Sequence, residues 1–230
     1  MVTRSKINSQ VSLRPDKVFS TRNDHYAAWG KRLFDIIFAA LILIGLSPVY
    51  LAIAILIAVS SGGSVLYIHP RVGLHGKEFN CIKFRTMIEG ADKYLEEYLN
   101  SCPISRAEYE ESFKLKYDPR ITAIGKFLRV TSLDELPQFW NVLTGDMSVV
   151  GPRPLVQAEL VKYGKMIDRV LSVRPGIAGL WQVSGRNDLP YARRVQLDAS
   201  YVRRMSLSLD IWLIIRTILV VIYPKGKGAY

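Results

Sequence analysis

The sequence is poor in the residues that build disulfide frameworks and zinc sites. It contains two cysteines, Cys81 and Cys102, and three histidines in 230 residues. Two cysteines cannot form a disulfide framework or a cysteine-rich zinc site in a chain of this length, and the histidines stand in no metal-ligand spacing. The sequence therefore favours a reducing, cytoplasmic setting.

Acidic residues are also scarce: 20 Asp and Glu against 31 Lys and Arg give a net charge of +11. This surplus predicts an anionic partner, such as nucleic acid, an anionic membrane surface or a phosphorylated small molecule. The chain lacks a P-loop, a strand-linked GxGxxG and any recognised nucleic-acid-binding motif, so we expect no nucleic-acid partner. Hydrophobic residues at 49% and charged residues at 22% exclude a disordered chain. The length suits one domain with appendages.

A long uncharged run is the most distinctive feature of composition. Residues 36–59 carry no charge over 24 positions, which predicts a membrane-embedded segment. The run starts about 35 residues into the chain and continues into SSGGS without a cleavage pattern, so it is not a cleaved signal peptide. As one helix it would be roughly 36 Å long, enough to cross a hydrocarbon core of about 30 Å.

Ser47 and Pro48 interrupt the middle of this run, where proline removes a helical hydrogen bond. Basic residues flank both ends, with Lys31 and Arg32 before the run and Arg71 among those that follow. Positive residues mark the cytoplasmic side, so both ends are expected there. A re-entrant hairpin bent at Ser47-Pro48 fits both features, with the Ser47 hydroxyl serving a freed carbonyl. A proline-kinked transmembrane helix remains the alternative.

Three regions follow from these patterns. Residues 1–30 are expected to form a polar arm or linker, 31–60 the membrane hairpin and 61–230 a cytoplasmic, membrane-associated domain. Within the domain, residues 65–87 predict two short strands joined by a glycine-containing turn. Residues 88–117 predict two short helices broken at Cys102-Pro103.

Two apolar patterns near the end of the chain bear on membrane contact. Residues 191–205 predict an amphipathic basic helix, for which lying on an anionic bilayer and packing on the core are equally good explanations. Residues 211–223 form a short apolar run interrupted by Arg216, which is too short for a confident second span.

Two adjacent carboxylates, Asp134 and Glu135, are the first candidates for catalysis. Ser132-x-x-Glu135 also fits a capping box, in which the acids only stabilise a helix start, and this explanation stays open. Basic residues in turn-rich segments favour an oxyanion site instead. They are Lys83, Arg85, Arg129, Arg153 and Arg174.

These residue types suit phosphoryl chemistry. An ionised carboxylate can attack phosphorus and form an aspartyl-phosphate type of intermediate. A divalent cation on the adjacent carboxylate and bidentate arginines would offset its repulsion by a diphosphate. Mg²⁺ is the expected ion, because it accepts one or two carboxylates together with substrate phosphates.

Three loops could present groups to anions. Gly151-Pro152-Arg153-Pro154 predicts a rigid turn that presents an arginine, and a structural turn with a solvated arginine is its alternative. The loops RPGIAG, with Arg174, and SGRN, with Arg186, could add backbone amides and guanidinium groups.

The motifs KRLFDIIFAALILIGLSPVYL, KFRTM, TSLDELPQFWNVLTGDMSVVGPRP and RPGIAGLWQVSGRN closely resemble those of the bacterial sugar transferase family, the monotopic polyprenyl-phosphate phosphoglycosyl transferases. The resemblance covers roughly residues 29–230, and the block from DELPQ to GPRP is highly specific. It implies an α-rich α+β fold with a re-entrant membrane helix-break-helix, a small cytoplasmic catalytic domain with short strands, and interfacial amphipathic helices. It also favours the hairpin over the kinked span.

The resemblance implies a reaction as well. A sugar 1-phosphate would pass from a UDP-sugar, expected to be UDP-galactose or UDP-glucose, to undecaprenyl phosphate. UMP would be released at the cytoplasmic face of the bacterial inner membrane, which starts assembly of an exopolysaccharide, O-antigen or capsule. Asp134 would be the nucleophile that carries the phosphosugar, and Glu135 would hold Mg²⁺.

Further residues fall on motifs of the family. Arg71, Lys83, Arg85, Arg129 and Arg153 would contact phosphate or nucleotide, as would Arg174 and Arg186 in their loops. Asp210 would assist the metal or organise the site, and Ser47 and Pro48 would form the membrane bend.

Several points stay open from sequence. A catalytically silent, membrane-bound scaffold of a polysaccharide-assembly complex is the alternative function. A homodimer is one candidate for the oligomeric state. The end of the chain resembles galactose and glucose phosphate transferases with large hydrophobic N-terminal regions, so we expect either a naturally short member or the catalytic part of a longer protein.

Overall fold

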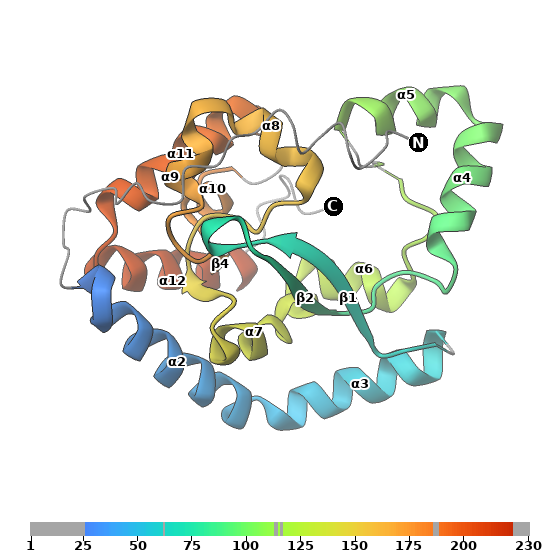
Figure 1. Ribbon diagram of the computed structural model, residues 1–230. Coiled ribbons are helices and arrows are strands. Elements are labelled where there is room, and N and C mark those ends of the chain that lie inside the picture. Colours follow the sequence, from blue (N-terminus) through green and yellow to red (C-terminus); the bar gives the residue numbers. More distant parts are fainter. Residues whose placement is uncertain (1–25, 62, 113–114, 116, 186–188, 223–230) are drawn as a thin grey trace.

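Helices make up most of the fold, and short strands form two separate two-stranded sheets (Figure 1). The structure, a computed structural model, describes residues 26–61, 63–112, 115, 117–185 and 189–222. The helices of seven or more residues are α2 (Lys31–Gly45), α3 (Ser47–Ser61), α4 (Ala91–Ser101), α5 (Pro103–Ser112), α6 (Ala123–Val130), α7 (Gln138–Thr144), α11 (Tyr191–Arg204) and α12 (Leu207–Ile222). The four-residue helices are α8 (Leu160–Tyr163), α9 (Ile167–Val170) and α10 (Leu180–Val183). The strands are β1 (Leu66–Val72), β2 (Glu78–Phe84), β3 (Ser148–Val150) and β4 (Gly176–Ala178). The helix-rich α+β class expected from the sequence is confirmed.

The long apolar run folds as two helices with a sharp break, where the sequence predicts it. The axes of α2 and α3 are bent by 61°. Pro48 has no N–H to donate to the carbonyl four residues earlier, that of Ile44. The Ser47 hydroxyl donates to this Ile44 oxygen at 2.8 Å, which confirms its predicted role. Within the described residues no single helix has the length and hydropathy of a membrane span, and only the bent pair passes that test as a unit.

The predicted strand pair is a β-hairpin. β1 and β2 pair antiparallel, with Tyr67 opposite Lys83 and His69 opposite Cys81. Side chains of opposite residues share a face of a sheet, and alternate residues lie on the same face. One face of the hairpin therefore presents Tyr67, His69, Cys81 and Lys83, with Arg71 two residues beyond His69.

The structure also tests the helices predicted within residues 88–117 and 191–205. α4 ends at Ser101 and α5 begins at Pro103, so the predicted break is confirmed. In α11, the stripe of Val195, Ala199 and Val202 is buried in the hydrophobic core. Packing on the core, one of the two explanations considered for this helix, is what the structure shows.

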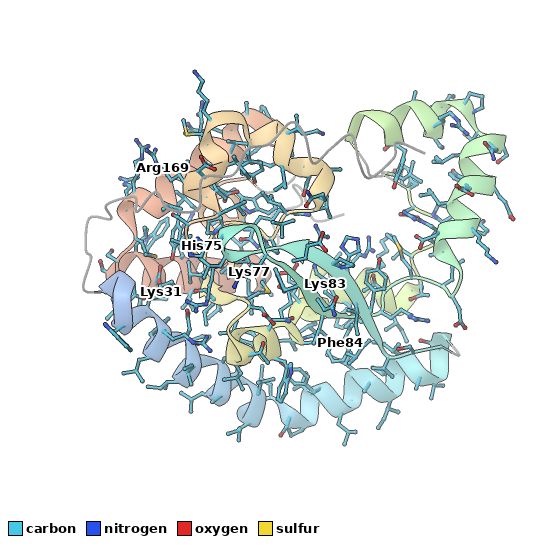
Figure 2. The ribbon with its side chains drawn as sticks, in the orientation of Figure 1. Lys31, His75, Lys77, Lys83, Phe84 and Arg169 are labelled. Carbon is cyan, nitrogen blue, oxygen red and sulfur yellow. The ribbon has the colours of Figure 1, made fainter. Side chains whose placement is uncertain are left out.

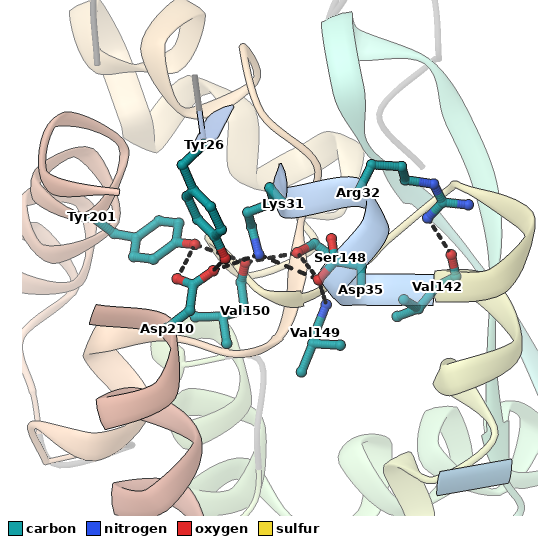
Figure 3. Close-up of polar contacts among 10 residues, drawn as sticks. All are labelled: Tyr26, Lys31, Arg32, Asp35, Val142, Ser148, Val149, Val150, Tyr201 and Asp210. Carbon is teal, nitrogen blue, oxygen red and sulfur yellow. Dashed lines mark hydrogen bonds and ion pairs between the residues drawn. The ribbon is translucent and has the colours of Figure 1, made fainter. Parts of the chain in front are cut away.

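The start of α2 is joined to the rest of the protein by buried polar groups (Figure 3). Lys31 Nζ lies 2.8 Å from an Asp210 oxygen and 3.3 Å from an Asp35 oxygen. The hydroxyls of Tyr26 and Tyr201 donate to the two Asp210 oxygens at 2.7 and 2.8 Å. Tyr26 belongs to a π-helical turn, Tyr26–Gly30, so the polar arm predicted over residues 1–30 reaches into the folded body at its end. Residues 1–25 lie outside the described residues.

Asp35 completes this network on the side of β3. Its Oδ1 accepts hydrogen bonds from the Ser148 hydroxyl and the Val149 amide, both at 3.0 Å. Asp35 and Asp210 are 1% and 0% exposed. The network therefore ties α2 to both β3 and α12, with one ammonium between two carboxylates.

We expect Lys31→Met to destabilise the protein by about 3 to 5 kcal/mol, because two buried carboxylates lose the ammonium group that pairs with both. The measurement is the free energy of unfolding in mild detergent by chemical denaturation. Lys126→Met on the exposed side of α6 is the matched control and should change it by less than about 0.5 kcal/mol. Equal stability of the two variants would contradict the importance of the network.

Candidate active site

The acidic pair lies in a short 3₁₀ turn, Leu133–Glu135, between α6 and α7. Ser132 precedes this turn in the left-handed backbone region, with φ of 56°, and its side chain makes no capping hydrogen bond. The capping box considered from the sequence is therefore not formed. The two carboxylates are free of that structural task.

Lys83 connects the hairpin to this turn. Its Nζ lies 2.7 Å from Glu135 Oε1, and it extends from the end of β2 (Figure 2). Burial alone would lower the pKa of Lys83, but Glu135 and Asp134 outweigh it and raise that pKa. Burial opposes ionisation of Glu135 too, yet Lys83 holds the pKa of this carboxyl below its usual range. Glu135 and Lys83 thus form a stable ion pair at neutral pH.

The pKa of Asp134 is shifted in the opposite direction to that of Glu135. Burial, followed by the charge of Glu135, raises the pKa of Asp134 from 3.8 to about 6, although Lys83 and Arg129 counteract the shift. The carboxylate is still mostly ionised at pH 7. A carboxylate with a raised pKa is more basic, and so a stronger nucleophile, than an ordinary aspartate.

Arg129 is held beside Asp134 by the packing of α6. Its Nε donates to the Thr86 hydroxyl at 2.9 Å, just beyond β2. Helix α6 approaches this segment so closely that a Cβ on Gly125 would lie 1.9 Å from the Thr86 carbonyl oxygen. The glycine therefore allows the approach that places Arg129 where its charge acts on Asp134, and its predicted contact with phosphate stays a prediction.

Arg71 and Arg153 approach from the other end of the hairpin. Val72 at the end of β1 donates to the Leu155 carbonyl at 2.8 Å, which docks the GPRP loop on the hairpin. The charge of Arg153 favours ionised Glu135, and it is the largest charge effect on Arg71, so the three groups share one electrostatic neighbourhood. Within the described residues neither arginine has a carboxylate partner within 4 Å.

The GPRP loop is fixed by contact with the RPG loop. Gly176 donates to the Pro152 carbonyl at 2.8 Å, and Gly151 donates to the Ala178 carbonyl at 2.9 Å. A Cβ on Gly176 would lie 1.9 Å from the Gly151 nitrogen, so this position requires glycine. The rigid turn predicted for the loop is present, and it presents Arg153.

Arg174 and Arg85 are not brought to the acidic pair. Arg174 Nε donates to the Gly145 carbonyl at 2.7 Å, at the end of α7, and its predicted phosphate role stays a prediction. A guanidinium at a helix C-terminus stabilises the last carbonyls. The guanidinium of Arg85 lies against Gly63, and its buried Nη1 has no hydrogen-bond partner among the described residues.

The two remaining predictions have different outcomes. Asp210 is completely buried, and Tyr26, Lys31 and Tyr201 occupy its oxygens, so the structure corrects the predicted metal role to a structural one. Arg186 lies outside the described residues.

The structure also adds residues that the sequence analysis missed. His69 lies on the hairpin face of Lys83, and the strand alternation alone would have indicated it. Burial, together with Arg71 and Lys83, lowers the pKa of His69 and keeps it neutral. Trp181 and Asp198 lie near Arg153, and no local pattern pointed to them.

Comparisons with known proteins agree with this arrangement. Residues 26–224 match the family described as "Bacterial sugar transferase". The chain is 50% identical over 206 residues to the UDP-galactose-lipid carrier transferase of Erwinia amylovora, covering 90% of this chain and 43% of that protein. It is 50% identical over 200 residues to the undecaprenyl-phosphate galactose phosphotransferase of Salmonella typhimurium, covering 87% and 41%. It is 47% identical over 197 residues to the exopolysaccharide production protein ExoY of Rhizobium meliloti, covering 86% and 87%.

The chain thus spans less than half of the first two relatives and most of the third. The match to the family extends from the turn before α2 to beyond α12, and it includes the acidic pair, the hairpin and the GPRP loop. The chain belongs to the bacterial sugar transferase family, as its motifs predicted.

Proposed function

We propose that this protein transfers a sugar 1-phosphate from a UDP-sugar to undecaprenyl phosphate and releases UMP. The observation that carries the proposal is Asp134, a half-buried carboxylate with a raised pKa beside the Glu135–Lys83 ion pair. Relatives named for undecaprenyl-phosphate galactose and glucose-1-phosphate transfer support this class of donor and acceptor. UDP-galactose and UDP-glucose are the proposed donors.

The reaction has two displacements at the same phosphorus. A carboxylate oxygen of Asp134 attacks the β-phosphorus of the donor, the bond from that phosphorus to the bridging oxygen breaks, and UMP leaves with the electron pair. An oxygen of undecaprenyl phosphate then attacks the aspartyl phosphosugar. The bond between phosphorus and the Asp134 oxygen breaks, which regenerates the carboxylate and gives undecaprenyl diphosphate sugar.

The basic residues offset the negative charge of both steps. Lys83 pairs with Glu135 and the charge of Arg129 acts on Asp134, while Arg71 and Arg153 bring two guanidinium groups without carboxylate partners in the described structure. Guanidinium groups bind phosphate oxygens in bidentate fashion. They would orient the diphosphate for attack and stabilise charge on the leaving UMP.

Mg²⁺ is the proposed cofactor, and the acidic pair suits it. The described residues contain no cluster of three or more His, Cys, Asp or Glu side chains arranged to hold a metal. Mg²⁺ commonly binds one or two carboxylates and completes its shell with water and substrate phosphates. Glu135 would contribute an oxygen, shared with Lys83. The ion would neutralise part of the diphosphate charge.

We propose that α2 and α3 enter the inner membrane from the cytoplasmic face and return to it. Both ends of the pair attach to the same folded body: Lys31 and Arg32 bind it at the start of α2, and α3 leads into β1. Two ends held by one domain favour a re-entrant path over a crossing. Large apolar side chains exposed on the two helices would contact lipid: Leu33, Ile37, Leu41, Ile44, Leu51, Ile55, Leu56 and Val59.

The end of the chain would extend this contact at the interface. Helix α12 exposes Ile211, Trp212, Ile215 and Ile218, and it lies near α2 in the fold (Figure 1). An apolar helix face with a tryptophan suits the boundary between headgroups and acyl chains.

We expect Pro48→Ala to increase exposure of the N-terminal arm to the periplasm. Alanine restores an N–H donor for the Ile44 carbonyl, which favours a straight helix. The measurement is labelling of a cysteine introduced into the arm with a membrane-impermeant maleimide, applied to intact spheroplasts. Val49→Ala is the matched control and should leave the arm protected. If Pro48→Ala also stays protected, the attachment of both ends to the domain determines the path.

We expect Asp134→Asn to abolish UMP release, because the amide keeps the shape of the side chain but is not a nucleophile. The measurement is UMP release by the purified protein with Mg²⁺, undecaprenyl phosphate and UDP-galactose or UDP-glucose. Asp92→Asn, an exposed residue of α4, is the matched control and should retain activity. Full activity of Asp134→Asn would contradict the covalent mechanism, and an inactive wild-type protein would favour the scaffold.

We expect the first displacement to lose activity as the pH falls through about 6. The pKa of Asp134 is raised to about 6, so its nucleophilic carboxylate is protonated below this pH, whereas an ordinary aspartate would stay ionised to about pH 4. The measurement is the burst of UMP release without acceptor, which removes the titration of the lipid phosphate. Lys83→Met should move the acid limb to higher pH, since Lys83 lowers this pKa. An acid limb near pH 4 in the wild-type protein would contradict the assignment of Asp134 as the nucleophile.

A further inference from the structure

A second group of polar side chains lies around Trp181, on which Arg153 stacks. Three of its buried atoms have no hydrogen-bond partner among the described residues: Trp181 Nε1, Tyr191 Oη and Asp198 Oδ1. Trp181 is 5% exposed and Asp198 is 1% exposed. Buried polar atoms are nearly always paired, so several unpaired ones in one place indicate partners supplied by a ligand.

Two arginine side chains of this group stack on Trp181. The guanidinium carbons of Arg153 and Arg194 each lie 5.4 Å from the centre of its ring system. Arg194 extends from α11, and its Nε donates to the Leu189 carbonyl at 3.1 Å. Stacking on an indole restricts both guanidinium groups with little loss of hydrogen-bonding capacity.

The arginine side chains around Trp181 act on one another electrostatically. Burial, followed by the charge of Arg153, lowers the pKa of Arg194 and likewise that of Arg71. The charge of Arg153 therefore acts on two other guanidinium groups. A concentration of like charge in a protein is stabilised when an anion binds to it.

Asp198 is the buried carboxyl group of this set of side chains. Its Oδ2 accepts a hydrogen bond from the Tyr163 hydroxyl at 2.9 Å. The Tyr163 ring packs edge-on against the Tyr191 ring, with 6.0 Å between the ring centres. Burial raises the pKa of Asp198 to about 7, against the opposing effects of Tyr163 and Arg153. The backbone amide and the charge of Arg153 both lower the pKa of Asp198, so the carboxyl lies against the loop that carries Arg153.

The group is continuous with the acidic pair through Arg153, whose charge acts on Glu135. In Figure 1, α10 and α11 lie on the other side of the hairpin from α3, which is the proposed lipid-embedded helix. A water-soluble ligand therefore has better access to this end of the site than a polyprenyl chain.

We propose that Trp181, Tyr191 and Arg194 form a subsite for the nucleoside monophosphate part of the donor, and that Asp198 is a positioning residue for Arg153 between this subsite and the acidic pair. The assignment rests on the proposed function for the identity of the donor. Arg153 and Arg194 bind phosphate oxygens, while Trp181 Nε1 and the Tyr191 hydroxyl supply hydrogen bonds to the nucleotide.

The test is binding of UMP to the full chain in detergent, measured by isothermal titration calorimetry, with uridine and inorganic phosphate as separate probes. Arg194→Gln should weaken UMP binding by about tenfold or more, because it removes a charge-assisted hydrogen bond. Trp181→Phe keeps a ring for stacking and removes the N–H, so it should weaken UMP binding severalfold. Arg193→Gln, the exposed neighbour on α11, is the matched control and should leave binding unchanged.

Asp198→Asn tests the positioning role separately. We expect a higher KM for the UDP-sugar, with kcat and the KM for undecaprenyl phosphate unchanged. A lower melting temperature with no change in the donor KM would mean that Asp198 is structural only, and would overturn its assignment.

The other outcomes separate this subsite from the reaction. Wild-type binding of UMP by Arg194→Gln, with its fold confirmed by circular dichroism, would overturn the subsite, as would an equal loss in Arg193→Gln. A rise in the KM for undecaprenyl phosphate alone would overturn it in favour of the acceptor. UMP binding that depends on Arg194, without UMP release that depends on Asp134, would support the subsite and refute the proposed reaction.

Discussion

One buried ammonium group, that of Lys31, is the contact on which the arrangement of this protein depends. It lies between Asp35 on its own helix and Asp210 on α12, and hydroxyl groups of Tyr26 and Tyr201 complete the shell of Asp210. Two buried carboxylates around one ammonium are costly unless hydrogen bonds satisfy the remaining lone pairs. The Ser148 hydroxyl and the Val149 amide do so for Asp35. The start of α2 is therefore bound to the body that also carries the active site.

The attachment of α2 to the folded body is needed to interpret the break between α2 and α3. A proline can kink a helix that crosses a membrane, so the 61° bend by itself does not determine a path. Arg32 adds a second attachment, donating to the carbonyls of Val142 and Leu143 at the end of α7. The basic residues at the start of α2 thus do more than mark a membrane side. They hold the apolar pair against the helix that follows the acidic turn.

The active site depends on opposite pKa shifts of two adjacent carboxyl groups. Lys83 reaches Glu135 and stabilises its charge, whereas burial and the charge of Glu135 raise the pKa of Asp134. The same dipeptide therefore contains one strongly ionised group, suited to holding cations, and one more basic group, suited to attack on phosphorus. This division comes from the hairpin, which is distant in sequence from the dipeptide but supplies the lysine.

Local sequence patterns determined the break at Ser47-Pro48, the hairpin, the break between α4 and α5 and the acidic pair, because proline, strand alternation and motif residues act over a few positions. Buried partners give Asp210 a structural role in place of the metal role considered for it, and the phosphate role of Arg174 stays a prediction, since both stand in motif-like segments whose partners the sequence does not show. Tyr26 and Asp210 meet across 184 positions, and Arg174 reaches the carbonyl of Gly145, 29 positions away. Only the tertiary structure decided which charged groups share the active site and which hold the fold together, because charges act through space and the chain sets that distance only when it is folded.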